Sequence, residues 1–188
     1  MLSGLGALLT AATALYALLH AYPEWVEREQ YRRKAEKAEK ILTCFYEGEQ
    51  CLRSIRSPLL LAAELEAARK ALGDASMEFG SSPSNKEVER EVYQDRFSEH
   101  KKYWERLYAM FPIAKLSFDT VVYDSLKVIS DVANEVLNAA QSLPNISEED
   151  ASTWRGILIH TGGPDDKITS RIKSAEAKLV DALGEYCR

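Results

Sequence analysis

The chain has 188 residues, a formal net charge of −5 and an isoelectric point near 5.4. This acidic balance argues against a nucleic-acid-binding protein, which usually carries a basic face, and the length suits one domain with a proper core. Nine glycines and six prolines are too few for long disorder, and the three cysteines form no C-x-x-C pair of a zinc or thioredoxin-type site.

The N-terminal stretch, residues 2–22, is almost continuously apolar. It reads LSGLGALLTAATALYALLHAY and contains no Asp, Glu, Lys or Arg. About 20 apolar residues cross the hydrocarbon core of a bilayer as a helix, so we interpret residues 1–23 as a membrane anchor. A cleaved signal peptide would need a basic start and a small-residue cleavage site, and an interfacial helix would need a polar face. A helix buried in a soluble assembly is the alternative that the sequence leaves open.

Basic residues predict the orientation of this anchor. They follow the apolar run and none precedes it, so the positive-inside rule places the N-terminus outside and the C-terminal domain in the cytoplasm. The predicted location is the inner (cytoplasmic) membrane of a bacterium, crossed in a single pass. Membrane lipid is therefore an expected partner, and the candidate membrane-proximal basic residues are Arg28, Arg32, Arg33 and Lys34.

Small side chains recur at four-residue spacing within the anchor. Such stripes allow helix backbones to approach closely in lipid, so they predict a packing surface and a possible homo-oligomer. Simple alanine richness is the alternative explanation. The candidate packing residues form two stripes: Ser3, Ala7 and Ala11 on one, and Thr13, Ala17 and Ala21 on the other.

Helical periodicity runs through residues 24–188, which we interpret as one bundle domain. The first helix is expected to continue out of the anchor, with at most a kink at Pro23, as far as Ser57. Its apolar positions recur every three or four residues. We predict further helices, separated by a loop at 73–84 and by Pro112, over residues 59–72, 85–111, 113–140, 147–159 and 166–186.

These elements predict an all-α fold, in which an N-terminal membrane-spanning helix continues into a cytoplasmic bundle of about five helices. The segment Ile55-Arg56-Ser57-Pro58, preceded by the helix EKAEKILTCFYEGEQCLRS, is followed by a loop, a long aromatic-rich helix, a tryptophan-bearing segment and a terminal helix after Asp165-Asp166. This order resembles a group of short uncharacterised bacterial proteins with one N-terminal span and a cytoplasmic helical domain. The resemblance implies fold and topology, and no activity. The leucine-rich segment after Pro58 departs from the polar, glycine-containing loop expected there.

No catalytic or metal-binding pattern is present. His20, His100 and His160 are far apart, and the Glu-x-x-His pattern of di-iron bundles is missing, so no catalytic residue, metal or cofactor is predicted. The loop that starts at His160 reads HTGG; a phosphate-binding loop is one interpretation, and a helix end closed by glycine is the favoured one.

Arg53 and Arg56 flank the start of the next predicted helix. They are placed to bind an anionic partner, although surface pairing with Glu64 or Glu66 is the simpler expectation.

The sequence thus favours a non-enzymatic, membrane-tethered helical module that binds protein partners or assembles on the cytoplasmic face of a bacterial membrane. One alternative is an effector that disrupts membranes when it oligomerises, suggested by the small-residue stripes and the modest hydrophobicity of the anchor. A second is a helical enzyme whose site is assembled across helices. The identity of the protein partner does not follow from the sequence.

Overall fold

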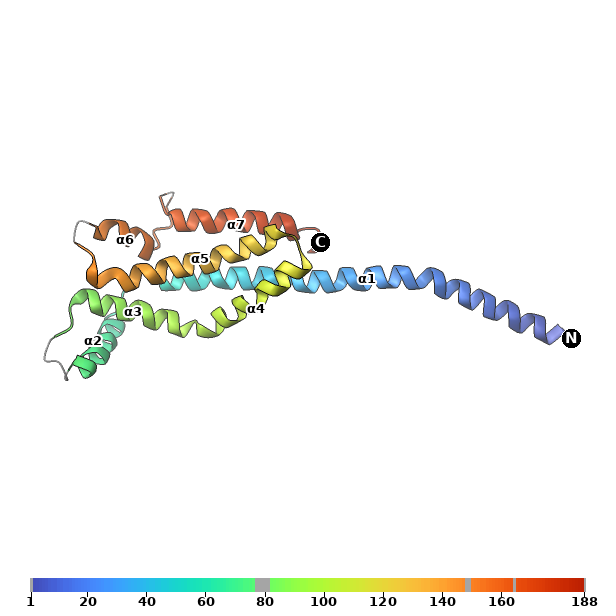
Figure 1. Cartoon of the computed structure of the whole chain (residues 1–188), viewed down its shortest axis with the longest axis horizontal. Helices are drawn as coiled ribbons and strands as arrows, with labels where there is room; N and C mark the ends of the chain where they lie inside the picture. The colour runs from blue at the N-terminus through green and yellow to red at the C-terminus, as the bar shows by residue number, and fades with distance from the viewer. Residues whose placement is uncertain (1, 77–81, 148–149, 164, 188) are drawn as a thin grey trace.

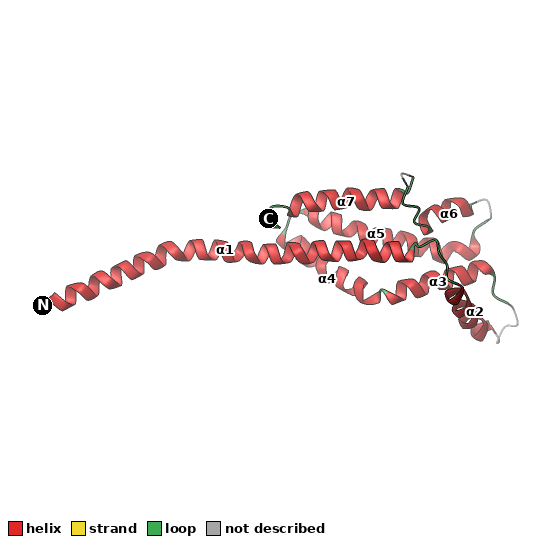
Figure 2. Cartoon of the chain, turned by 180° about the vertical axis from the view of Figure 1, so that it is seen from behind, coloured by secondary structure: helices red, strands yellow, loops and turns green. Residues whose placement is uncertain are grey.

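A computed structural model describes residues 2–76, 82–147, 150–163 and 165–187; the side chains of residues 2–14, 17–20, 75, 76, 151, 152 and 155 are outside the description. Over the described residues the chain is all-α, with no strand, which confirms the predicted class (Figure 2). The elements are α1 (Leu2–Ile55), α2 (Ala62–Ser76), α3 (Asn85–Glu99), α4 (Lys101–Ser117), α5 (Thr120–Ser142), the 3-10 turn η1 (Leu143–Asn145), α6 (Ala151–Leu158) and α7 (Lys167–Leu183).

Helix α1 is a single rod of 54 residues, roughly 80 Å long at 1.5 Å per residue. It passes through Pro23 without a break, as the sequence predicts. It joins the bundle at Tyr31, whose hydroxyl donates to the carbonyl of Glu185. Most side chains between positions 21 and 30 are exposed, and the N-terminal part of α1 projects well beyond the other helices (Figure 1).

Helix α5 is the centre of the bundle. The predicted helix 113–140 was wrong in its start, because residues 113–117 belong to α4, and Leu116 of its predicted apolar stripe is 86% exposed. From Val122 onward the stripe lies in α5, where Val122, Leu126, Ile129, Ala133, Val136 and Ala140 are buried; α5 packs on α7, α4, α3 and α1. Helix α5 is strongly amphipathic. Burial of its apolar face against several helices provides much of the hydrophobic driving force for folding. The buried side chains around it from α1 and α7 are Ala38, Ile41, Phe45, Leu52, Ile55, Ile168, Ile172, Ala175, Leu179 and Leu183.

The predicted single helix 85–111 was wrong in its boundaries. The structure breaks at His100, between α3 and α4, and α4 runs through Pro112 to Ser117. At this break the Phe97 carbonyl accepts a hydrogen bond from the Trp104 indole N–H, at 3.3 Å. Pro112 therefore does not end this helix.

Helix α2 makes a small second cluster against α3. Ala68 is buried between Val88 and Val92, with Leu65 packed beside them. The predicted loop at 73–84 is shorter than expected at its start, because α2 continues through Gly73 to Ser76; residues 77–81 lie outside the description.

The predicted membrane span is not supported by the described part of the chain. No helix there is both long enough and apolar enough to cross a bilayer. Most side chains of the N-terminal apolar run fall outside that description.

Candidate functional site

The predicted packing stripes in the anchor lie in α1. The side chains of Ser3, Ala7, Ala11, Thr13 and Ala17 are outside the described residues, and only that of Ala21 is described, as exposed. The packing of these stripes therefore stays a prediction.

The predicted basic residues on the stalk are mostly compensated by glutamates of the same helix. Arg28 lies 3.6 Å from Glu24. Arg32 and Arg33 both bind Glu29, at 3.0 and 2.9 Å. Hydrogen bonds from Arg32 and then Arg33 lower the pKa of Glu29 to about 2, so this carboxylate stays charged.

The remaining predicted basic residue behaves differently. The Lys34 ammonium lies 5.7 Å from the centre of the Tyr186 ring and has no carboxylate partner among the described residues. It thus carries a charge that the stalk does not neutralise.

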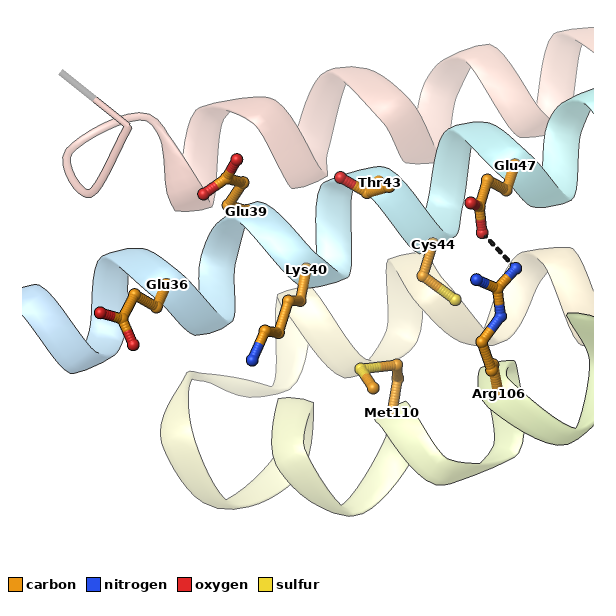
Figure 3. Close-up of a pocket in the computed structure, with 8 residues that line it drawn as sticks. All are labelled: Glu36, Glu39, Lys40, Thr43, Cys44, Glu47, Arg106 and Met110. Carbon is orange, nitrogen blue, oxygen red and sulfur yellow. Dashed lines mark hydrogen bonds and ion pairs between the residues drawn. The ribbon is translucent and has the colours of Figure 1, made fainter.

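A groove between α1 and α4 is the main candidate binding surface (Figure 3). Its first hollow has a volume of about 460 Å³. Cys44 and Met110 point into the space between the two helices, and Glu47 and Arg106 form an ion pair of 2.7 Å across it. The full lining is Glu36, Glu39, Lys40, Thr43, Cys44, Glu47, Arg106 and Met110.

A second hollow lies on the same side of the molecule and shares Glu47 and Arg106 with the first. Its volume is about 410 Å³. Here the Cys51 sulfur lies 3.5 Å from His100 Nδ1. The Glu47–Arg106 pair thus belongs to both hollows and links them into one groove.

Gly48 brings α1 and α4 together beneath this groove. The Tyr103 hydroxyl donates to the Cys44 carbonyl at 3.1 Å, directly over Gly48. A Cβ at Gly48 would lie 2.0 Å from the Tyr103 oxygen and 2.7 Å from a methyl of Ile129. Only glycine permits this approach.

The reactive side chains of the groove are held in their neutral forms. Burial, followed by the nearby Glu47 carboxylate, raises the pKa of Cys51 to about 11. Burial also raises the pKa values of Cys44 and Tyr103. A thiol is nucleophilic as its thiolate, so this arrangement suits binding better than covalent catalysis.

The far end of the bundle is closed by a buried ion pair. Arg56 is only 2% exposed, so the prediction that it binds a surface partner was wrong. Its guanidinium lies 3.0 Å from Asp166 and donates to the carbonyls of Ile157 and Ile159. Arg53 instead pairs with Glu49 on the surface at 2.6 Å.

Asp166 is the N-cap of α7, as the sequence allowed. It accepts hydrogen bonds from Thr169, Arg56 and the Thr161 N–H, and lies 3.2 Å from His160. Burial favours its protonation, but the hydrogen bonds from Thr169 and Arg56 outweigh burial and hold its pKa well below the ordinary value. The His160 loop therefore lies between the end of α6 at Leu158 and the N-cap of α7, and Gly162, which has a positive φ, comes four residues after α6 ends. Closure of that helix end by a glycine stays a prediction.

A second arginine fixes the segment between α1 and α2. Arg96 forms a double hydrogen bond with Glu64, both at 2.9 Å, and donates to the carbonyls of Ile55, Ser57 and Leu59. The expected pairing of Glu64 with Arg53 or Arg56 is thus replaced by Arg96. No sequence pattern connects these residues, because they lie far apart along the chain.

Groups of three or more His, Cys, Asp and Glu placed to hold a metal do not occur within the described residues. Comparison with known proteins finds no matching family model, no matching curated protein and no matching solved structure. The resemblance noted from the sequence stays an expectation.

Proposed function

We propose that this chain is a non-enzymatic, membrane-tethered helical module that binds a protein partner or assembles on the cytoplasmic face of a bacterial membrane. The observation that carries the proposal is helix α1. Its N-terminal part is apolar in sequence and projects from the bundle, while its C-terminal part supplies buried residues such as Phe45 to the core (Figure 1). One helix thus connects the candidate anchor to the folded domain.

An aromatic pair lies where the apolar run ends and supports this reading. Tyr22 and Trp25 are each 60% exposed and their rings are 6.2 Å apart. Tyrosine and tryptophan favour the membrane–water boundary, because their rings combine apolar faces with a polar edge. Charged residues begin between the two aromatic residues, at Glu24, and continue after them with Glu27.

The α1–α4 groove is the surface that we assign to the protein partner. It combines an apolar floor, at Cys44 and Met110, with charged walls on both helices. Its thiols and Tyr103 are held neutral by burial, which supports binding and gives no nucleophile. A partner helix or loop that presents one apolar side chain between charged residues fits this lining.

Cell fractionation tests the anchor. The full chain, fused at its C-terminus to a reporter active only in the cytoplasm, should stay in the membrane pellet after a carbonate wash and should be active. The matched control replaces Leu8 and Leu9 by arginine, which costs about 3 kcal/mol for each charge at the centre of a span and should release the protein. A wild-type chain recovered in the soluble fraction would refute the tether.

Crosslinking tests the groove. A photo-activatable amino acid at the exposed groove residue Thr43 should give a discrete crosslinked product in cells. The same amino acid at Lys127, an exposed position on α5, is the control. Equal products from both positions, or products from Lys127 alone, would contradict the assignment of the groove.

A further inference from the structure

The end of the bundle from which α1 projects carries a distinct set of side chains, four of them exposed and one, Tyr186, half-buried. The turn between α4 and α5 and the C-terminus both lie at this end (Figures 1 and 2). We call this set the collar and define it as Lys34, Lys37, Lys115, Leu116 and Tyr186. Lys34 and Lys37 come from α1, and Lys115 and Leu116 come from the end of α4, so the fold brings together two segments that are far apart in the sequence.

Aromatic contacts hold the collar in a fixed arrangement. The Tyr186 ring lies 5.8 Å from that of Tyr31 and 5.5 Å from that of Phe118. Tyr31 also donates its hydroxyl to the Glu185 carbonyl. The C-terminal segment, the stalk and the α4–α5 turn are therefore bound to one another at this level.

The collar lysines carry uncompensated charge. Lys34 and Lys115 lie over aromatic rings, 5.7 Å from the centre of Tyr186 and 5.9 Å from that of Tyr123. The Lys37 ammonium donates to the Ser117 hydroxyl at 3.0 Å. Unlike the stalk arginines, none of these three lysines forms an ion pair within the described part of the chain.

Acidic groups also lie near these lysines, and they have other contacts: Glu36, between Lys34 and Lys37 in the sequence, pairs with Arg32 at 2.9 Å. Asp119 accepts the Val122 N–H at 3.4 Å as the N-cap of α5, and the Glu185 side chain is hydrogen-bonded to Tyr186.

An apolar side chain projects from the middle of this basic region. Leu116 is 86% exposed, the highest value among the exposed large hydrophobic residues of the described chain. It is the last apolar residue of α4 and precedes the turn at Ser117. A leucine beside lysines is the composition that binds the surface of an anionic membrane, since the lysines attract phosphates and the apolar group enters the acyl boundary.

We propose that the collar docks on the membrane that holds α1, with anionic phospholipid headgroups bound by Lys34, Lys37 and Lys115 and with Leu116 at the level of the headgroups. This inference rests on the proposed anchor. Lys34 and Lys37 follow Trp25 by nine and twelve residues, so the collar lies about 14–18 Å farther along α1 than the interfacial aromatic pair. The lysine side chains of α1 are directed back toward its N-terminus, and so toward the membrane, and a helix tilt within the usual range of about 0–40° brings one side of the bundle closer to the headgroups.

Lipid-dependent quenching tests this docking. The full-length chain carrying Leu116→Cys and Cys187→Ser is labelled with bimane and reconstituted in nanodiscs that contain a headgroup-nitroxide lipid. Cys44 and Cys51 label slowly because Cys44 is buried, Cys51 is half-buried and both thiols have raised pKa values. The matched control is Tyr108→Cys in the same background, on the same helix, 53% exposed and roughly 12 Å from Leu116.

The expected result is stronger quenching at position 116 than at position 108, and only when phosphatidylglycerol is added to phosphatidylcholine. Changing the three collar lysines to glutamine should lower the ratio of docked to undocked bundle on the order of 100-fold, at about fivefold for each lysine. The charge-matched control changes Lys70, Lys101 and Lys102, which are exposed and away from the collar, and should leave quenching unchanged.

Two outcomes separate the collar from the anchor. A chain that resists the carbonate wash but shows equal quenching at positions 116 and 108 refutes the collar alone. A chain that is washed off refutes the anchor, and quenching at position 116 in anionic discs would then still support the collar. Quenching that is independent of phosphatidylglycerol, or unchanged in the collar-lysine variant, refutes the role of the lysines.

Discussion

Replacing Gly48 by alanine tests the close contact between α1 and α4. The added methyl group would lie 2.0 Å from the Tyr103 oxygen and 2.7 Å from Ile129, so both neighbours must move. Overpacking of this kind costs about 1–3 kcal/mol, and loss of the Tyr103–Cys44 hydrogen bond about 1 kcal/mol more. Alanine recovers about 1 kcal/mol of helix propensity. The net expectation is a loss of about 1–3 kcal/mol, or roughly 2–12 °C in Tm.

Thermal unfolding followed by circular dichroism, with the full chain in detergent, measures this effect. The matched control is Gly73→Ala in α2, where nothing lies within 4 Å of the added carbon and propensity alone should raise stability by about 0.5–1 kcal/mol. Tyr103→Phe should recover part of the loss in the Gly48→Ala background, because it removes the colliding oxygen. A Gly48→Ala variant as stable as the wild type, or shifted upward like Gly73→Ala, would refute the reasoning.

Three further predictions concern the buried pair and the thiols. Asp166→Ala leaves the Arg56 charge buried without its carboxylate partner and should lower the free energy of unfolding, measured in urea, by about 3–5 kcal/mol. The double variant Arg56→Met with Asp166→Leu should recover most of this loss. Equal losses in the single and the double variant would contradict this prediction. Because the folded state lowers the pKa of Asp166, its contribution to stability is present above about pH 4 and is lost as pH falls further; an Asp166→Asn chain should lack this acid-dependent loss, and identical pH profiles would argue against it. With a pKa of about 11, Cys51 should carry on the order of 300-fold less thiolate at pH 7.5 than an ordinary thiol, so mass spectrometry should find Cys187 alkylated first; equal rates would disprove the shift.

Local rules predicted much of the fold. The apolar stripe from Val122 to Ala140 gave a buried face of α5, because a helix with one apolar face must cover it. Asp165 and Asp166 were the two candidates for the N-cap of the last helix, since a short acceptor side chain before a periodic run satisfies the first free N–H groups, and the structure places Asp166 there. These features depend on a few neighbouring residues, so they can be read from the chain.

Long-range choices could not be predicted in this way. The pairing of Arg56 with Asp166 joins residues 110 positions apart, and no local pattern distinguishes this arginine from the exposed Arg53. The break at His100 has no proline or glycine; the packing of two helix segments against the core decides it.

The groove had one usable signal in the sequence. Gly48 falls on the apolar stripe of α1, three residues after Phe45 and four before Leu52. A glycine on a core face indicates that another backbone or ring approaches closely. The identity of that neighbour, Tyr103, depended on how α4 folds back, which the stripe does not specify.

The uninterrupted course of α1 makes its register a mechanical variable. Each residue advances a helix by about 1.5 Å and turns it by about 100°. Deleting one residue between Trp25 and Tyr31 would therefore swing the whole bundle by about a quarter turn about the axis of α1. Deleting a full turn of three or four residues would lower the bundle by about 5 Å while nearly restoring its facing direction. The stalk thus sets, residue by residue, which side of the domain is presented to neighbours and at what height.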